Sequence, residues 1–407
     1  MRDVFIVDAA RSPIGKFLGS LSGYSATQIG AEVVKALLKR TKVKSPDVNE
    51  LITGNVISAG LGQNPAKQVV RYSGMPDEIP TTNVNKVCAS GLEAIDNGFL
   101  KIASGRADVI IAGGVESMSN APYSVKGRDV HKIGNISLND FVEKLKQAGK
   151  DLTKMEVVDE MVNAGLWDCY VNLHMGTLAE KIGEKYKISR QEQDKFAVES
   201  HRKAADAIDK GKFKKEIVPI KLPDGRIFEV DEGVRKDSSL EKLAGLKPAF
   251  RPDGTITAAN ASQLSDGASF VVLMSEQKMK EYGLRPLAKI EGYAASGNDP
   301  TWYGLAPTPA IRKVLETTNH TLNQIDLIEL NEAFCVQALG VVKELGIDVS
   351  KLNVNGGATA LGHPIGATGA RILTTLIYAM HDRNKKLGLA ALCHGGGGAA
   401  AMVISKI

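Results

Sequence analysis

Leu352-Asn-Val-Asn355 in the last third of the chain repeats Thr82-Asn-Val-Asn85 in the first third. Each copy leads into a glycine-bearing turn and then into an amphipathic helical pattern. Outward from these segments the order of elements is also shared, because an apolar run, a helical pattern and a second apolar run precede each copy, beginning at Val4 and at Leu287. Two copies of one structural unit are the simplest explanation of this internal similarity.

The end of the first copy is interrupted by a long insertion. Each helix is followed by an apolar run typical of a buried strand, at residues 108–114 and 387–393. In the second copy the last strand, residues 399–405, follows almost at once. Its counterpart in the first copy, residues 267–274, comes about 150 residues later in the chain. Residues 121–265 are therefore predicted to be an insertion between the last two strands of the first copy.

Strands that alternate with helices predict a mostly parallel sheet in each half. The predicted fold class is α/β, a duplicated α/β fold with an inserted lobe. We expect three domains: an N-terminal half (residues 1–120 plus 266–285), the inserted lobe (121–265) and a C-terminal half (286–407). The 407 residues are sufficient for more than one core, because single cores stop growing at roughly 250–300 residues.

Composition excludes several classes of protein. The net charge of +5 suits a polyanionic small ligand, and no basic run is dense enough to suggest nucleic-acid binding. There is no apolar stretch of about 18 residues and residues 4–7 form a strand pattern, so we expect neither a membrane span nor a signal peptide, and a cytoplasmic protein. The cysteines form no CxxC pair, which argues against a disulfide framework and against any metal site. They are Cys88, Cys169, Cys335 and Cys393.

Cys88 occupies a position where α/β proteins place ligands, between a predicted strand and a helix that begins near Ser90. The positive end of the helix dipole favours the thiolate relative to an ordinary pKa of about 8.5. A cysteine here can also be a buried small hydrophobic residue. The repeat argues for a reactive thiol, because the second copy has a histidine in the corresponding loop.

That histidine is His363, within the glycine-rich residues 355–371, and Pro364 disfavours helical geometry for it. Two pseudo-symmetric halves would place their equivalent loops opposite each other. Cys88 facing His363 would form a nucleophile and base for covalent acyl transfer. The alternative interpretation is that His363 is structural.

Cys393 ends an apolar strand and opens His394-Gly-Gly-Gly-Gly-Ala-Ala400. No Lys-Ser/Thr follows and no GxGxxG spacing leads into a helix, so a phosphate-binding loop is a poor interpretation. Backbone amides beside a sulfur could instead bind a developing oxyanion, an interaction worth about 3 kcal/mol per donor in other acyl-transfer sites. A plain glycine-rich turn is the structural alternative.

Four segments resemble the motif blocks of the thiolase family, in the same order and over nearly the whole chain. They are Asn85-Lys-Val-Cys-Ala-Ser-Gly91, Asn331-Glu-Ala-Phe334, Gly362-His-Pro-Ile-Gly-Ala-Thr-Gly369 and Cys393-His-Gly-Gly-Gly397. The resemblance implies a thiolase-like duplicated α/β fold. It also implies an acyltransferase of acetyl-CoA C-acetyltransferase type, which interconverts two acetyl-CoA with acetoacetyl-CoA plus CoA and needs no cofactor beyond these substrates.

The resemblance also assigns roles to individual residues. Cys88 would carry the acyl group, and His363 would take its proton and help to bind the thioester oxygen. Asn331 would hold a water in the same oxyanion site. Cys393 would move the proton at the α-carbon of the second substrate. The amides of Cys88 and Gly395 would bind the carbonyl of the acyl-enzyme.

The inserted lobe resembles the coenzyme-A platform of that family. His174 and Met175 match a segment beside the acyl group and pantetheine, and Arg235 matches an arginine near the adenosine phosphates. Leu246 matches an apolar pantetheine contact, and Ser262 a hydroxyl that meets the pantetheine amide. By itself, Arg235 among neighbouring charges would be interpreted as part of a solvated surface.

The chain departs from the usual thiolase pattern at three positions. His394 replaces an aliphatic residue and Gln263 replaces a glycine, but neither change removes a catalytic group. Tyr303 matches a position often held by methionine at the acyl pocket, and its ring would favour short acyl groups such as those of acetoacetyl-CoA. The alternative is a 3-ketoacyl-CoA thiolase for longer chains. The resemblance further implies a role in lipid metabolism and a homodimer or homotetramer.

Three other functions compete with this hypothesis. A β-ketoacyl synthase shares the duplicated fold but would pair its cysteine with two histidines, and Asn331 stands in place of the second. A nicotinamide-dependent oxidoreductase would need a dinucleotide fingerprint that the sequence lacks. A silent scaffold would not be expected to retain every reactive side chain. The direction of the reaction, condensation or thiolysis, stays open.

Overall fold

The computed structural model describes residues 2–125 and 135–407, and its main sheet runs through both halves of the chain. The order along this sheet is β14-β15-β16-β13-β1-β12-β5-β3-β4, with β2 (Gly15–Lys16) beside β12. The strands of the first half are β1 (Val4–Arg11), β3 (Glu50–Gly54), β4 (Thr81–Val84), β5 (Val109–Ser117) and β12 (Ser265–Ser275). Those of the second half are β13 (Ala288–Gly297), β14 (Leu327–Leu330), β15 (Leu387–His394) and β16 (Gly398–Lys406).

The strand order confirms the duplication. Outward from β1 run β12, β5 and β3, and outward from the adjacent β13 run β16, β15 and β14. The two central strands pair over Phe5 with Lys289 and Ile6 with Ala288. The strand β4 has its counterpart in a single parallel bridge between Ile328 and Leu352. The duplicated α/β fold predicted from the repeat is therefore present.

The prediction of a mostly parallel sheet is wrong, because each half is mixed. The strand β3 pairs in parallel with β4 and β5, and β14 with β15. The strands β12 and β16 pair antiparallel with both of their neighbours. The glycine turn at residues 395–397 explains this result in the second half, since a short connection can only join antiparallel strands. In the first half the insertion replaces that turn, yet β5 and β12 keep the same antiparallel pairing.

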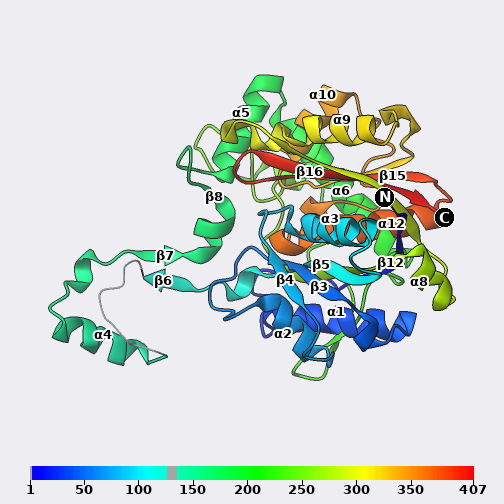
Figure 1. The fold of residues 1–407 in the computed structure, drawn as a ribbon. Coiled ribbons are helices and arrows are strands. Elements are labelled where there is room, and N and C mark those ends of the chain that lie inside the picture. The colour runs from blue at the N-terminus through cyan, green and yellow to red at the C-terminus, as the bar shows by residue number, and fades with distance from the viewer. Residues whose placement is uncertain (1, 126–134) are drawn as a thin grey trace.

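Helices alternate with the two halves of the sheet in layers (Figure 1). One outer layer packs on the first half, another on the second half, and α3 and α12 lie between the halves (Figure 1). The helices are α1 (Ala26–Thr41), α2 (Pro65–Tyr72), α3 (Ser90–Ala103), α8 (Glu276–Glu281), α9 (Pro307–Thr317), α10 (Cys335–Leu345), α11 (Ala358–Leu361) and α12 (Ile365–Asp382). Among the residues described, no helix combines the length and apolar character needed to cross a membrane.

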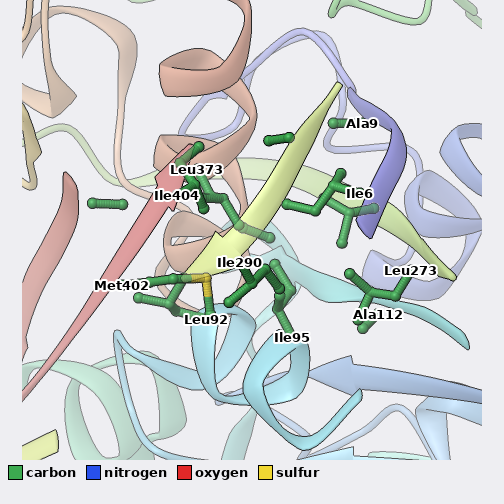
Figure 2. Packing of buried hydrophobic residues seen from close by; sticks show 14 of the residues in the cluster. Ile6, Ala9, Leu92, Ile95, Ala112, Leu273, Ile290, Leu373, Met402 and Ile404 are labelled. Atoms are coloured by element: carbon green, nitrogen blue, oxygen red, sulfur yellow. The ribbon is translucent and has the colours of Figure 1, made fainter. Parts of the chain in front are cut away.

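The central core surrounds α3 and α12. Leu92 and Ile95 of α3 join Leu373 of α12 in one buried cluster, together with Ile290 and Met402 from strands of the second half (Figure 2). The helix α12 is buried over almost its whole length, including the side chains of Arg371 and of three threonines. Both halves of the molecule thus share one core around this helix pair.

Glycines bring the two central helices into backbone contact. A Cβ added to Gly91 of α3 would lie 3.0 Å from the amide nitrogen of Ala370, and one on Gly369 of α12 would lie 2.5 Å from the amide nitrogen of Leu92. Ordinary helix pairs pack 8–10 Å apart at distances set by their side chains. The small residues therefore allow an approach that larger side chains would prevent.

The segment between β5 and β12 forms small sheets and helices outside the main sheet. It comprises β6 (Tyr123–Val125), α4 (Leu138–Gln147), β7 (Val157–Asp159), β8 (Trp167–Asp168), β9 (Leu173–His174), α5 (Met175–Tyr186), α6 (Arg190–Asp209), β10 (Ile220–Lys221), β11 (Ile227–Phe228) and α7 (Leu240–Ala244). The antiparallel pair of β6 and β7 and the helix α4 extend away from the rest of the molecule, whereas α5 and α6 pack beside α10 (Figure 1).

We expect Gly369→Ala to lower the free energy of unfolding by about 1–3 kcal/mol. Alanine gains about 1 kcal/mol of helix propensity over glycine. The added methyl group would, however, meet backbone of Leu92, which cannot rotate away. Chemical denaturation measures the difference. Gly245→Ala is the matched control, because no atom lies within 4 Å of its added Cβ, and it should change stability by less than about 0.5 kcal/mol. Equal stability of both variants would contradict the close approach.

Candidate active site

Cys88 lies in a tight turn immediately before α3. The amide of Lys86 donates to the Ser90 hydroxyl over 2.8 Å, and this hydroxyl donates to the carbonyl of Val87 over 2.6 Å. Val87 has a φ of 49°, a left-handed conformation that is unusual for a β-branched residue. The turn thus holds the thiol in a fixed position at the first turn of the helix, where the sequence pattern predicted it.

The thiolate expected at Cys88 is not supported. Burial raises the pKa of the Cys88 thiol to about 12, although the backbone amides of Gly395 and of Cys88 itself lower it and Glu116 raises it further. Desolvation of the sulfur therefore outweighs the amides and the helix dipole. The Cys88 thiol is therefore neutral at rest, and it needs a base to give up its proton.

Cys393 lies beside this thiol, near the end of β15. Its side chain is buried, and burial followed by the neighbouring Cys88 raises its pKa above the usual range. The backbone amide of Gly395, two residues further along the chain, acts on the Cys88 sulfur and lowers its pKa. The glycine turn therefore brings both a second sulfur and a backbone donor to Cys88.

His363 and Asn331 contact each other in the site. The Asn331 amide nitrogen Nδ2 lies 3.4 Å from Nε2 of His363, and both side chains are buried. Burial lowers the pKa of His363 to about 3, and the positive charge of Arg371 lowers it further. The imidazole is therefore neutral at neutral pH and able to accept a proton. The Oδ1 atom of Asn331 has no hydrogen-bond partner within the described residues, so its capacity to accept a hydrogen bond is unused.

The loops of Cys88 and His363 meet at one apolar cluster. Ile365, two residues beyond His363, packs there with Val56 and with the side chain of Cys88. The structure thus brings together Cys88, His363, Cys393 and Asn331, which the sequence placed at the ends of different predicted strands.

Glu116 is a structural residue of the site that the sequence analysis missed. It is fully buried at the end of β5, where its carboxylate accepts from the Asn55 side chain over 2.8 Å and from the amides of Val56 (3.1 Å) and Gly366 (3.0 Å). Burial nevertheless raises its pKa to about 7. Glu116 links the loop after β3 to the start of α12, just beyond His363. Its partner in α12 lies 250 residues away in sequence, so no local pattern could have identified it.

Glu332 plays the same part beside Asn331. Its buried carboxylate accepts from the side chains of Ser200 (2.8 Å) and Asn353 (2.7 Å) and from the amide of Thr359 (3.0 Å). The sequence motif around Asn331 contains this glutamate, but only the structure assigns it a role. It fixes the end of β14 against α6 and α11.

The candidate coenzyme-A residues divide into two groups. His174 caps α5 and stacks on Phe250, with 4.8 Å between ring centroids, and Met175 is buried in one cluster with Cys393. The amide of Ser262 donates to the carbonyl of Ala333 over 3.0 Å, close to Asn331. Arg235 and Leu246 are exposed. The structure brings the first three to the catalytic candidates and leaves Arg235 and Leu246 at the surface.

Two of the three departures from the family pattern, Gln263 and His394, make polar contacts of their own. The Gln263 side chain donates to the carbonyls of Gly233 (2.9 Å) and Thr359 (3.0 Å), and its backbone carbonyl accepts from the amide of His363 over 3.1 Å. His394 makes a 2.7 Å hydrogen bond from Nδ1 to the carbonyl of Gly395. Neither side chain displaces a catalytic candidate.

Tyr303 fills space beside the two sulfurs. It is 2% exposed and packs in one cluster with Met175 and Cys393. Its hydroxyl donates to the carbonyl of Met175 over 3.1 Å. Burial raises the pKa of Tyr303, and Cys393 and Cys88 raise it further, so all three lie close together.

Comparison with known proteins gives matches over the whole chain. Residues 4–277 match the family model described as thiolase, N-terminal domain, and residues 284–406 match that described as thiolase, C-terminal domain. The acetyl-CoA acetyltransferase of Allochromatium vinosum is 46% identical, with 100% of this chain and 99% of the relative covered. That of Cupriavidus necator is 47% identical, with 100% of both covered.

Solved structures agree with these sequence relatives. The crystal structure of the Bacillus anthracis acetyl-CoA acetyltransferase has a TM-score of 0.92 and 41% identity, with 100% of this chain and 99% of that chain covered. Human mitochondrial 3-ketoacyl-CoA thiolase in complex with CoA has a TM-score of 0.92 and 38% identity, with 100% and 98% covered.

The raised pKa of Cys88 predicts the absence of a thiolate at neutral pH. A thiol whose pKa is raised stays protonated below that value, so the thiolate should form only in strongly alkaline solution. The ultraviolet absorption of thiolate should therefore be the same for the wild type and Cys88→Ser between about pH 6 and 9. A titration step near or below pH 7 that is present only in the wild type would show that Cys88 is ionised at rest.

Proposed function

The chain belongs to the thiolase family, and we propose that it is an acetyl-CoA C-acetyltransferase that interconverts two acetyl-CoA with acetoacetyl-CoA plus CoA. One observation carries this proposal: two sulfurs, a neutral imidazole and a backbone donor converge from three separate segments. An ordinary thioester hydrolase would need only one of these sulfurs. The second sulfur supports formation of a carbon–carbon bond.

In the first half-reaction Cys88 attacks the thioester carbonyl of acetyl-CoA. His363 takes the thiol proton, a sulfur–carbon bond forms, and CoA leaves after receiving that proton. Because both groups are neutral at rest, charge develops only as the bond forms. We propose that the Gly395 amide donates to the carbonyl of the acyl-enzyme, and its effect on the Cys88 sulfur supports this role. We propose that Asn331 holds a water, and its Oδ1 atom, unpaired within the described part of the chain, supports that role.

In the second half-reaction the Cys393 thiol passes its proton to His363, and the resulting thiolate removes a proton from the α-carbon of a second acetyl-CoA. The carbanion attacks the acetyl group on Cys88, a carbon–carbon bond forms, and Cys88 leaves as a thiolate that takes the proton held by His363. The products are acetoacetyl-CoA and the CoA released earlier. Proximity of the two sulfurs supports this division of roles, because the α-carbon must lie near both.

We propose that CoA enters over the inserted lobe, along His174, Met175 and Ser262, with Arg235 and Leu246 contacting its outer parts. The stacking of His174 on Phe250 supports a rigid wall at the inner end of the proposed CoA path. The exposed positions of Arg235 and Leu246 suit contact with the outer parts of a long ligand. The proposed reaction needs no further cofactor. We also propose a homodimer or homotetramer, a cytoplasmic location and a role in lipid metabolism.

Substitutions of the two cysteines should have different effects on the two half-reactions. Acetyl-CoA alone should add one acetyl group to Cys88 of the wild type, and Cys88→Ala should lose both acetylation and acetoacetyl-CoA synthesis. Cys393→Ala should still become acetylated, but its synthesis should fall by about 10²–10⁴-fold, the usual contribution of a general base. Mass spectrometry of the acetyl-enzyme and an assay of acetoacetyl-CoA measure the two steps.

Cys169→Ala is the matched control, because this cysteine is exposed and should affect neither step. Condensation by Cys393→Ala at the wild-type rate would refute the two-cysteine mechanism. Acetyl groups found only on other residues would refute the assignment of Cys88 as the nucleophile.

Tyr303 provides a test of chain length against the 3-ketoacyl-CoA thiolase alternative, which the likeness to the human enzyme keeps open. Tyr303→Leu should raise kcat/KM for longer 3-ketoacyl-CoA substrates relative to acetoacetyl-CoA by at least about tenfold, since one methylene in an apolar pocket is worth about 10–200-fold. Tyr303→Phe keeps the ring and should keep the wild-type preference. A wild type that already prefers the longer substrates would favour the alternative function.

A further inference from the structure

The Nδ1 atom of His363 contacts a buried hydroxyl that has no role in the proposed acyl-transfer mechanism. It lies 2.7 Å from Oγ1 of Thr368, in the first turns of α12. That hydroxyl also lies 2.9 Å from the carbonyl oxygen of Pro364, in donor geometry. Thr368 is fully buried, so no bulk water competes for these two contacts.

The two contacts together determine where the ring carries its proton. A threonine hydroxyl has one hydrogen, and the carbonyl of Pro364 can only accept. If the hydroxyl donates to Pro364, it must accept from His363, so Nδ1 carries the hydrogen. The other ring nitrogen agrees, because Nε2 faces the Asn331 Nδ2 atom at 3.4 Å, and an amide nitrogen can only donate. Both sides of the ring thus favour hydrogen on Nδ1 and a lone pair on Nε2.

We propose that Thr368 is a positioning residue that holds His363 in its Nδ1–H tautomer and so keeps the Nε2 lone pair ready for the Cys88 proton. This inference rests on the proposed acyl transfer at Cys88. In the opposite tautomer Nε2 would already carry a hydrogen and could not act as the base. The hydrogen bond from Nδ1 also stabilises the imidazolium that forms once Nε2 takes the proton, since both ring nitrogens are then donors.

The charged groups around the ring do not assign the tautomer by themselves. Arg371 lies on the same helix and acts on the ring through its positive charge. Glu116 reaches the start of that helix through the amide of Gly366, and the thiols of Cys88 and Cys393 are neutral. Only Thr368 makes a hydrogen bond to Nδ1 within the described part of the chain.

The test compares Thr368→Val with Thr368→Ser. Valine has the shape of threonine but no hydroxyl, and serine restores the hydroxyl. The Pro364 carbonyl also accepts from the Ala367 amide over 2.9 Å, so Thr368→Val leaves this buried oxygen with a donor and should still fold. Thr374→Val is the matched control, because it removes a buried hydroxyl from the same helix that bonds to Ser269 instead.

Two readouts are measured on the full-length protein. Nitrogen-15 NMR of labelled histidine, with His363→Asn to identify the signal, reports the tautomer without any substrate. Rapid-quench mass spectrometry reports the rate of Cys88 acetylation by acetyl-CoA. We expect the Nδ1–H tautomer in the wild type, Thr368→Ser and Thr374→Val. Thr368→Val should show a mixture of tautomers and acetylate about 10- to 100-fold more slowly, because part of a general-base contribution is lost.

Three results would overturn the proposal: a wild type with hydrogen on Nε2, a Thr368→Val variant that acetylates within about twofold of the wild-type rate, or an equal loss of rate in Thr374→Val. A purely structural role for Thr368 would lower stability without changing the tautomer. If the wild type is never acetylated, the proposed function fails, whereas the NMR result still decides which ring nitrogen carries the hydrogen.

Discussion

The approach of α3 to α12 is the constraint on which the rest of the structure depends. Gly91 and Gly369 let the backbones of these helices touch, and each helix begins directly after a loop that carries a reactive side chain. The spacing of the two helices therefore sets the spacing of Cys88 and His363. A shared core packed around the pair transmits this spacing to both halves of the sheet. The strands deliver the remaining groups to the same end, since β14 and β15 lead to Asn331 and Cys393.

Burial then controls the chemistry of the assembled site. It raises the pKa of Cys88 and lowers that of His363, so each group is neutral before the substrate binds. An ion pair at rest would require two charged side chains that are removed from water. Removing these charges from water costs more free energy than their mutual attraction returns. In the proposed acyl transfer, oriented backbone and amide dipoles would meet the developing charge instead, and such dipoles act strongly where water is excluded. The same environment makes the hydrogen bond between His363 and Thr368 decisive, because no solvent can replace it.

A large part of the fold and the site was predictable. The repeat of Thr82-Asn-Val-Asn85 at residues 352–355 gave the duplication, and the ends of apolar runs located the catalytic candidates. Strand direction was not predictable in the same way, because apolar runs do not distinguish a return through a glycine turn from a crossover through a helix. The thiolate at Cys88 was wrongly expected, since the helix dipole can be inferred from position but desolvation cannot. Glu116 was missed because it bonds across 250 residues.

The sequence by itself determined the identity and order of the candidate catalytic groups and the helical and strand periodicities. These properties are local, because each depends on residue types within a few turns or strands of one another. Only the tertiary structure decided the protonation states of Cys88 and His363, the tautomer that Thr368 favours, and the wall that Tyr303 builds beside the sulfurs. The physical reason is that desolvation and hydrogen-bond geometry depend on atoms from segments that lie far apart in the chain and meet only after folding.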